Sequence, residues 1–138
     1  MIIADTGFWI ALLFRGDDYH PQAAAAYRRY KDQLITTWPI LTETCHLLRR
    51  HVDPQAAAAL LEQAPAGFQV WELPQQAPRQ AAVLMRRYPD LPMDLADASA
   101  VLLAKHLGHG RILSTDRRDF AAYRWKDGQP FQNKLLGE

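Results

Sequence analysis

The stretch Ile2-Ile3-Ala4-Asp5-Thr6-Gly7 decides the fold of this chain. Its apolar residues are typical of a short buried strand, and Thr6-Gly7 predicts that the strand stops at a turn directly after Asp5. Similar runs occur at Leu34 to Trp38 and at Arg111 to Thr115, and an acidic side chain follows each of them within a few residues. The sequence therefore predicts a buried sheet whose strands end close to carboxylates.

Helical segments separate these strands. Strands that alternate with helices of about 10–15 residues predict an α/β fold, with a parallel sheet covered by helices on both faces. A third strand is expected over 67–73, where apolar and polar residues alternate, and a fifth over 123–126 at an edge of the sheet. The tail from Asp127 is polar and is expected to pack loosely. We expect helices over 8–14, 20–33, 39 onward, 54–64, 78–88 and 94–107.

The composition is that of an ordinary globular protein. The chain has 138 residues, 49% hydrophobic and 22% charged, and its net charge of +1 points to no nucleic-acid or membrane partner by itself. Cys45 is the only cysteine, so no internal disulfide is possible. The first residues lack the basic segment of a secretion signal, and Asp5 interrupts their apolar run. We therefore expect a single domain over 1–138 in the cytoplasm.

Four carboxylates are expected to meet at one edge of the sheet. Asp5 and Asp116 follow the first and fourth strands, and Glu43 lies early in the helix after the second strand. Asp97 lies in the first turns of the helix that leads to the fourth strand. Ligands of such sheets bind outside the carboxyl ends of the strands. The topology therefore predicts a single acidic site.

Each carboxylate also has an ordinary explanation: a turn, a helix cap, or the positive end of a helix. Asp97 fits its explanation worst, because residues 95–104 are apolar or small on nearly every side and an unpaired charge would not persist there. Together, these explanations do not account for a carboxylate on every element at the edge. The turn would explain Asp5, a helix cap would explain Asp94 with Asp97, a cap of the following short turn would explain Asp116, and the positive end of a helix would explain Glu43.

Crowded carboxylates repel one another, which raises some of their pKa values unless a cation is bound. Mg²⁺ or Mn²⁺ is the natural guest, because hard cations prefer oxygen ligands. Such an ion suits phosphate chemistry with water as the attacking group. The chain has none of the sequence motifs of other phosphate-handling or hydrolytic sites. It lacks a GxxxxGK[ST] loop and a GxSxG elbow, and it lacks an Asp-x-Asp nucleophile motif after the first strand, because position 7 is Gly7.

The order of four segments resembles a PIN domain, and more narrowly the VapC-type ribonuclease toxins of bacterial toxin–antitoxin pairs. The segments are Ile3-Ala4-Asp5-Thr6, Glu43, Asp97-Ala98 and Leu113 to Phe120, and the resemblance covers residues 1 to about 125. It implies a three-layer α/β/α sandwich around a parallel sheet of four to five strands. It also implies a ribonuclease that cuts RNA with Mg²⁺ or Mn²⁺.

The resemblance implies a role for each acidic residue. Asp5 and Asp97 would be the main metal ligands, and Glu43 and Asp116 would hold metal directly or through water and position the attacking water. These four residues would be catalytic. Asp94 and Asp119 are extra carboxylates with a secondary metal role, and the hydroxyls of Thr6 and Thr115 would support the carboxylates.

The resemblance also implies partners: an RNA substrate, a second copy of the chain in a homodimer, and an antitoxin protein whose C-terminal segment blocks the acidic cleft. Four aromatic residues are candidates for the antitoxin contact, although a core position is the commoner explanation: Trp9, Phe14, Tyr27 and Trp38.

Two other functions remain open from the sequence. A PIN nuclease with a housekeeping role in RNA processing or DNA repair would carry the same residues. A receiver-like signalling module also gathers aspartates around Mg²⁺, but it needs a lysine at the end of a late strand. The fourth strand here ends in Ser114-Thr115-Asp116.

Overall fold

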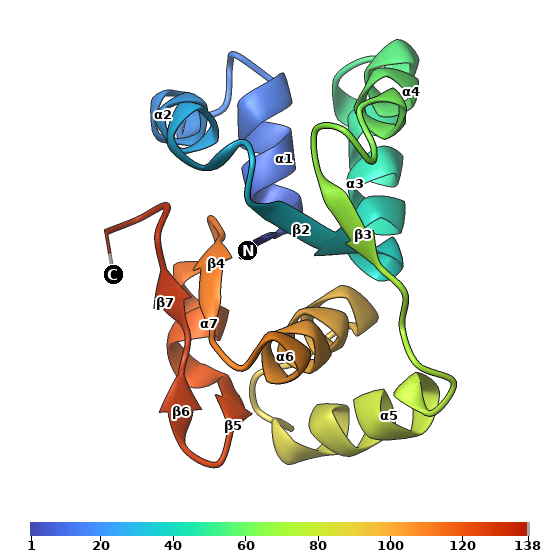
Figure 1. Cartoon of the computed structure of the whole chain (residues 1–138), viewed down its shortest axis with the longest axis vertical. Coiled ribbons are helices and arrows are strands. Elements are labelled where there is room, and N and C mark those ends of the chain that lie inside the picture. The colour runs from blue at the N-terminus through green and yellow to red at the C-terminus, as the bar shows by residue number, and fades with distance from the viewer. Residues whose placement is uncertain (138) are drawn as a thin grey trace.

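A computed structural model describes residues 1–137 of the chain. Five strands form its central sheet, in the order β3-β2-β1-β4-β7, and each pair of neighbours is parallel (Figure 1). The central strand β1 is buried along its whole length, as its apolar residues predict. The strands are β1 (Ile2–Ala4), β2 (Leu34–Thr37), β3 (Gln69–Trp71), β4 (Arg111–Leu113) and β7 (Gln132–Asn133).

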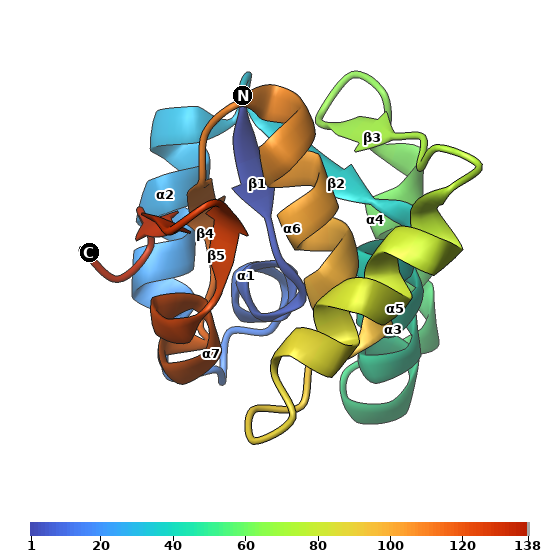
Figure 2. The same cartoon turned by 90° about the horizontal axis from the view of Figure 1, so that it is seen from below.

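Helices cover both faces of the sheet. Figures 1 and 2 show α5 and α6 on one face and α1 and α2 on the other, and α3 packs beside α1 and carries α4 with it. The three-layer α/β/α fold with a sheet of four to five strands is therefore confirmed. The helices are α1 (Thr6–Leu13), α2 (His20–Tyr30), α3 (Trp38–His51), α4 (Pro54–Glu62), α5 (Ala77–Arg87), α6 (Leu95–Leu107) and α7 (Arg117–Ala122).

The helix α6 is the most deeply buried of these helices. Residues 98–104 are all buried, because the helix packs on β2 and β1 on one side and contacts α5 and α3 on others. Gly108 ends it in the left-handed conformation with φ +79°, where its N–H bonds to the carbonyl of Ala104 at 2.9 Å. The helix that is apolar on nearly every side therefore runs through the core and begins at the carboxyl edge of the sheet.

The prediction of an edge strand over 123–126 is wrong. Strand β5 (Arg124–Lys126) pairs antiparallel with β6 (Gln129–Pro130) in a separate two-stranded hairpin that contacts α6. The intervening turn contains Gly128 with φ +79°, a conformation that suits glycine. The extended backbone was therefore predicted correctly, but the strand pairs with a neighbouring segment rather than with the central sheet.

The prediction of a loosely packed tail is also wrong. Phe131, Asn133 and Leu135 are 9%, 4% and 7% exposed, and the residues between them are exposed. This alternation is that of a strand with one buried face, and β7 indeed pairs with β4 as the fifth strand of the sheet. The segment is too short and too polar for its alternation to stand out in the sequence.

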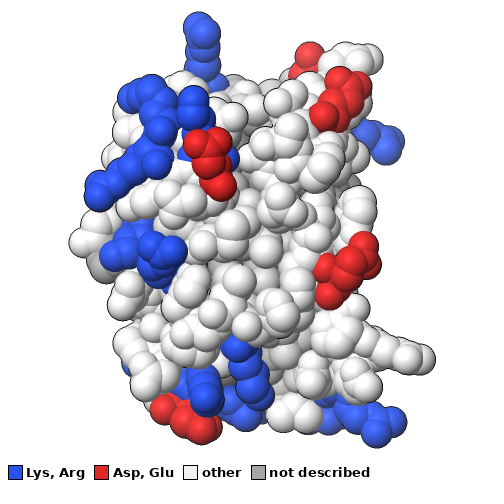
Figure 3. Space-filling model, viewed as in Figure 1, with Lys and Arg blue, Asp and Glu red and all other residues white. Residues whose placement is uncertain are grey.

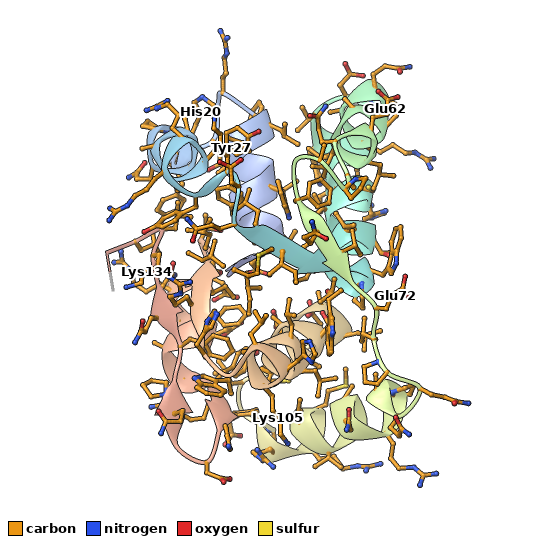
Figure 4. The ribbon with its side chains drawn as sticks, in the orientation of Figure 1. His20, Tyr27, Glu62, Glu72, Lys105 and Lys134 are labelled. Carbon is orange, nitrogen blue, oxygen red and sulfur yellow. The ribbon has the colours of Figure 1, made fainter. Side chains whose placement is uncertain are left out.

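Charged side chains lie in separate places on the face drawn in Figure 3. Lysine and arginine gather over α2 and along the lower edge, and acidic side chains lie mainly along the right-hand side, where Figure 4 labels Glu62 and Glu72. The charge is thus local, in keeping with a net charge of +1. Within residues 1–137, no helix is both long enough and apolar enough to cross a membrane.

Candidate active site

Asp5 leaves the sheet at the carboxyl end of the central strand and occupies the N-cap position of α1. Its side chain does not make the standard capping hydrogen bond to the helix; its Oδ2 accepts a hydrogen bond from Ser114 Oγ at 2.9 Å. The side chain is 5% exposed, and burial raises its pKa to about 7, helped by the charges of Glu43 and Asp116. Hydrogen bonds from Ser114 and from the backbone of Thr6 oppose this shift. Asp5 is therefore a carboxylate whose negative charge lacks compensation.

Two carboxylates at the start of α6 have different surroundings. Asp94 is the N-cap, and its side chain accepts a hydrogen bond from the N–H of Asp97 at 2.8 Å. Asp97 is partly buried and accepts a hydrogen bond from the hydroxyl of Tyr123 at 3.2 Å. Burial, then the charges of Asp94 and Asp5, raise the pKa of Asp97 to about 8. The capping explanation thus describes Asp94, and the carboxylate of Asp97 is left for another role.

Glu43 projects from the second turn of α3, and its pKa is raised by burial and by the charge of Asp94. Thr6 Oγ1 donates a long hydrogen bond of 3.4 Å to it. The helix starts at the edge of the sheet because Thr37, the last residue of β2, caps it by accepting a backbone N–H bond at 3.3 Å. Thr37 Oγ1 also lies 2.6 Å from Ser99 Oγ of α6, and this buried hydrogen bond ties together the two helices that carry carboxylates.

Ser114 joins Asp5 to the segment after β4. Its Oγ donates to Asp5 and also accepts a hydrogen bond from the N–H of Asp116 at 3.0 Å. Asp116 caps α7 by accepting the N–H of Asp119 at 3.0 Å, so its ordinary explanation as a cap is realised in the structure. Burial, with the hydrogen bond and charge of Asp116, raises the pKa of Asp119 to about 6.

The hydroxyl that supports Asp5 belongs to Ser114, which the sequence reasoning did not select. The neighbouring Thr115 was selected, but its side chain lies against Gly7, where an added Cβ would overlap the hydroxyl. The cause is strand register: Ala4 pairs with Leu113, so the residues that follow them, Asp5 and Ser114, lie side by side. Neighbouring residues of an extended chain point to opposite sides, so a register error of one residue exchanges the two hydroxyls.

Tyr123 is a second residue that the sequence reasoning missed. It is fully buried, its ring packs edge-on against Tyr88 and Phe120, and its hydroxyl reaches Asp97. Burial and the charge of Asp97 raise the pKa of its hydroxyl, so it stays protonated and donates. The only signal in the sequence is that a buried tyrosine needs a partner for its hydroxyl.

The carboxylates form one electrostatically linked group. Asp5 interacts with Glu43, Asp97 and Asp116, and Asp94 interacts with Glu43, Asp97 and Asp119. Within residues 1–137, no three His, Cys, Asp or Glu side chains form a ready metal-binding cluster. The buried charge of Asp5 and the carboxylate oxygens around it nevertheless fit a hard divalent cation that keeps several of its waters. They do not suit an ion that needs a complete protein cage.

A surface groove of about 600 Å³ adjoins this group, and Glu43 and Asp94 line it. Trp38 and Leu95, 49% and 51% exposed, line it as well, together with His46. Of the four aromatic residues considered for partner contacts, Trp38 and Phe14 are exposed and Tyr27 is partly buried. Trp9 is only 2% exposed and belongs to the core.

The sequence matches a known protein family and a related ribonuclease. The family model for the PIN domain matches residues 2–126. Ribonuclease VapC26 of Mycobacterium tuberculosis is 29% identical to this chain over 126 residues, which cover 89% of this chain and 92% of the relative.

Solved structures agree with this match. VapC20 of Mycobacterium tuberculosis, described as a sarcin-ricin loop cleaving toxin, superimposes with a TM-score of 0.80 at 25% identity, over 88% of this chain and 95% of that one. A toxin–antitoxin complex from Klebsiella pneumoniae shares the fold with a TM-score of 0.65 at 18% identity, over 91% and 94% of the two chains. Since the family model spans most of the chain and all the acidic residues discussed above, this chain belongs to the PIN domain family.

Proposed function

We propose that this protein is a metal-dependent endoribonuclease and the toxin of a type II toxin–antitoxin system. The observation that carries the proposal is the group of mutually repelling carboxylates around the buried Asp5, at the carboxyl edge of the sheet. The names of its relatives, Ribonuclease VapC26 and the toxin VapC20, support RNA as the substrate and toxicity as the role.

In this proposal Asp5 and Asp97 are the main ligands of Mg²⁺ or Mn²⁺. Glu43 and Asp116 hold the metal directly or through water and position the attacking water. Asp94 and Asp119 add negative charge at the rim. When bound, such an ion activates water and neutralises negative charge on phosphate oxygens.

The remaining residues of the site fix these carboxylates in place. Ser114 and Tyr123 each donate a hydrogen bond to a main ligand, Asp5 and Asp97 respectively. The Thr37–Ser99 hydrogen bond sets the spacing of α3 and α6. Supporting hydrogen bonds of this kind orient metal ligands and influence metal affinity.

The proposal includes the partners of a toxin. An antitoxin would cover the acidic group, and the exposed rings of Trp38 and Phe14 are candidate contacts, whereas the buried Trp9 is not. We also propose that the protein forms a homodimer. It would act in the cytoplasm, where its RNA substrate is present. Membership of the PIN family argues against the receiver-like module.

The decisive experiment compares Asp5→Asn and Asp97→Asn with the wild-type chain in RNA cleavage with Mn²⁺ and in growth after induced expression. Both variants are expected to fold, to lose cleavage and to stop inhibiting growth. Asp127→Asn, at an exposed position in the β5–β6 turn, is the matched control and should behave like the wild type. Cleavage at the wild-type rate by both site variants would refute the proposal.

A housekeeping nuclease of the same family is the other candidate. It would cut RNA or DNA in vitro, but its expression would not arrest growth. No co-expressed antitoxin would then be needed for the cells to grow. Growth arrest that a cognate antitoxin relieves separates the two roles. Mapping the ends of the cut RNA would identify the target.

A further inference from the structure

We propose that Asn133, in the C-terminal strand β7, is a positioning residue for Asp5 and acts on it through Ser114. The inference rests on the proposed function in one respect, namely that Asp5 is taken as a metal ligand. Asn133 lies beyond residue 126, where the match to the family model ends. The family assignment therefore gives it no role.

The side chain of Asn133 forms hydrogen bonds with both backbone polar groups of Ser114, the N–H and the carbonyl. Its Nδ2 donates to the carbonyl of Ser114 at 2.9 Å, and its Oδ1 accepts the N–H of Ser114 at 3.3 Å. Oδ1 also accepts the N–H of Leu135 at 3.1 Å. Because a carbonyl and an N–H face the two ends of the amide, only one orientation of the side chain satisfies all three partners.

This contact extends the pairing of β4 and β7 by one residue. The backbone ladder ends where the N–H of Lys134 donates to the carbonyl of Ile112 at 2.7 Å. Beyond that point the side chain of Asn133 does what a further strand residue would do. Ser114 is fully buried, so without Asn133 its N–H and carbonyl would lose these partners in the interior.

These hydrogen bonds to the backbone of Ser114 also fix the position of its hydroxyl. That hydroxyl donates to Asp5 Oδ2 at 2.9 Å and accepts the N–H of Asp116 at 3.0 Å. Movement of the Ser114 backbone would therefore shift one proposed metal ligand and the start of the segment that carries another. The geometry thus links β7 to Asp5 through two successive sets of hydrogen bonds.

Apolar residues on either side of Asn133 hold β7 in place. Phe131 packs against the ring of Phe120 with centroids 5.1 Å apart, and Leu135 is buried. Lys134, which is exposed, appears at the outer side of β7 in Figure 4. The strand is therefore anchored by its apolar side chains, and the amide of Asn133 is left to serve Ser114.

The test is a double-mutant cycle on Mn²⁺ binding, measured by titration calorimetry on the full chain. Asn133→Ala and Ser114→Ala are each expected to weaken Mn²⁺ binding by about tenfold, the lower end of what supporting residues of metal ligands contribute. The double variant should bind no more weakly than Ser114→Ala, because both changes act through one hydroxyl. Gln132→Ala, on the exposed side of the same strand, is the matched control and should bind Mn²⁺ like the wild type.

If Asn133 only held β7 in place, Asn133→Ala would behave like Phe131→Leu. Phe131→Leu loosens β7 without removing the amide, so it should lower the melting temperature and leave Mn²⁺ affinity unchanged. If Asn133→Ala does not fold, Asn133→Thr, which suits a strand and keeps one hydroxyl, takes its place in the cycle with a smaller expected loss.

Unchanged Mn²⁺ affinity in the folded Asn133 variant, or losses that add in the double variant, would overturn the inference. A wild-type chain that binds Mn²⁺ but cuts no RNA would refute the proposed nuclease and leave this inference standing. A wild-type chain that takes up no Mn²⁺ would overturn both.

Discussion

Asp5 is the residue at which folding and the proposed chemistry conflict. The folded chain keeps its carboxyl group away from water and beside other negative charges, and its pKa rises to about 7 as a result. In the unfolded chain the group ionises near its ordinary value of 3.8. Above that pH the unfolded state is favoured by ionisation, so the free energy of unfolding falls until the pH passes about 7.

Asparagine at position 5 should remove this penalty. At pH 8 and without metal, Asp5→Asn is expected to increase the free energy of unfolding by up to about 4 kcal/mol, the equivalent of the shift from 3.8 to about 7. At pH 4 the gain should nearly vanish, since the group is then largely protonated in both states. Urea unfolding at the two pH values measures the difference, with Asp127→Asn as the exposed control. An equal effect at both pH values would contradict the assignment.

Tyr123 is expected to influence the ionisation of Asp97. The hydrogen bond from its hydroxyl lowers the pKa of Asp97, so Tyr123→Phe should raise that pKa further while keeping the packed ring. The acid limb of the pH–rate profile for RNA cleavage should then move to higher pH. Tyr88→Phe is the control, because its hydroxyl accepts from the N–H of Arg124 rather than donating to Asp97. Identical profiles for wild type and Tyr123→Phe would contradict the expected contact.

At the scale of elements, the sequence predicted the fold where the pattern is long or strongly apolar. The buried strands at β1, β2 and β4 and the apolar helix α6 are of this kind. It failed at the C-terminal end, where β7 is only two residues long. Short strands carry little periodicity, and only packing selects their neighbours.

The candidate site was predictable only to the level of elements. Topology places Asp5, Glu43, Asp97 and Asp116 at one edge, because each follows a parallel strand or begins a helix there. Of the hydroxyls that touch the carboxylates, that of Thr6 was predicted from the sequence. Those of Ser114 and Tyr123 were not, since they are selected by strand register and by the path of the chain after α7. Those details are set by packing between distant segments.

Substitutions of Thr37 test whether its hydrogen bond to Ser99 sets the spacing of α3 and α6. Thr37→Ala removes the cap of α3 and its bond to Ser99, and we expect a loss of about 1–2 kcal/mol in the free energy of unfolding together with reduced cleavage. Thr37→Ser keeps the hydroxyl and should retain most of both. Thr42→Ala is the control, because its hydroxyl bonds only to the carbonyl of Trp38 within the exposed part of the same helix. Urea unfolding and cleavage rates, measured on the same preparations, decide the outcome.

At the scale of the whole molecule, a metal ion would connect segments from one end of the chain to the other. The proposed ligands come from residues 5 to 116, and their supports extend to residue 133. An ion that binds only the folded chain stabilises all of these segments together. Metal binding and global stability should therefore be two measurements of the same event.

Mn²⁺ at about 100 times its dissociation constant should add about 2.7 kcal/mol to the free energy of unfolding, which for a chain of this size is a rise in melting temperature of roughly 10 °C. The rise should shrink at pH 5.5, because protons compete for Asp5 and Asp97, whose pKa values are raised to about 7 and about 8. In Asp5→Asn the rise should be largely absent at both pH values. Thermal unfolding with and without Mn²⁺ provides the measurement. A rise that is independent of pH and retained in Asp5→Asn would place the ion elsewhere on the molecule.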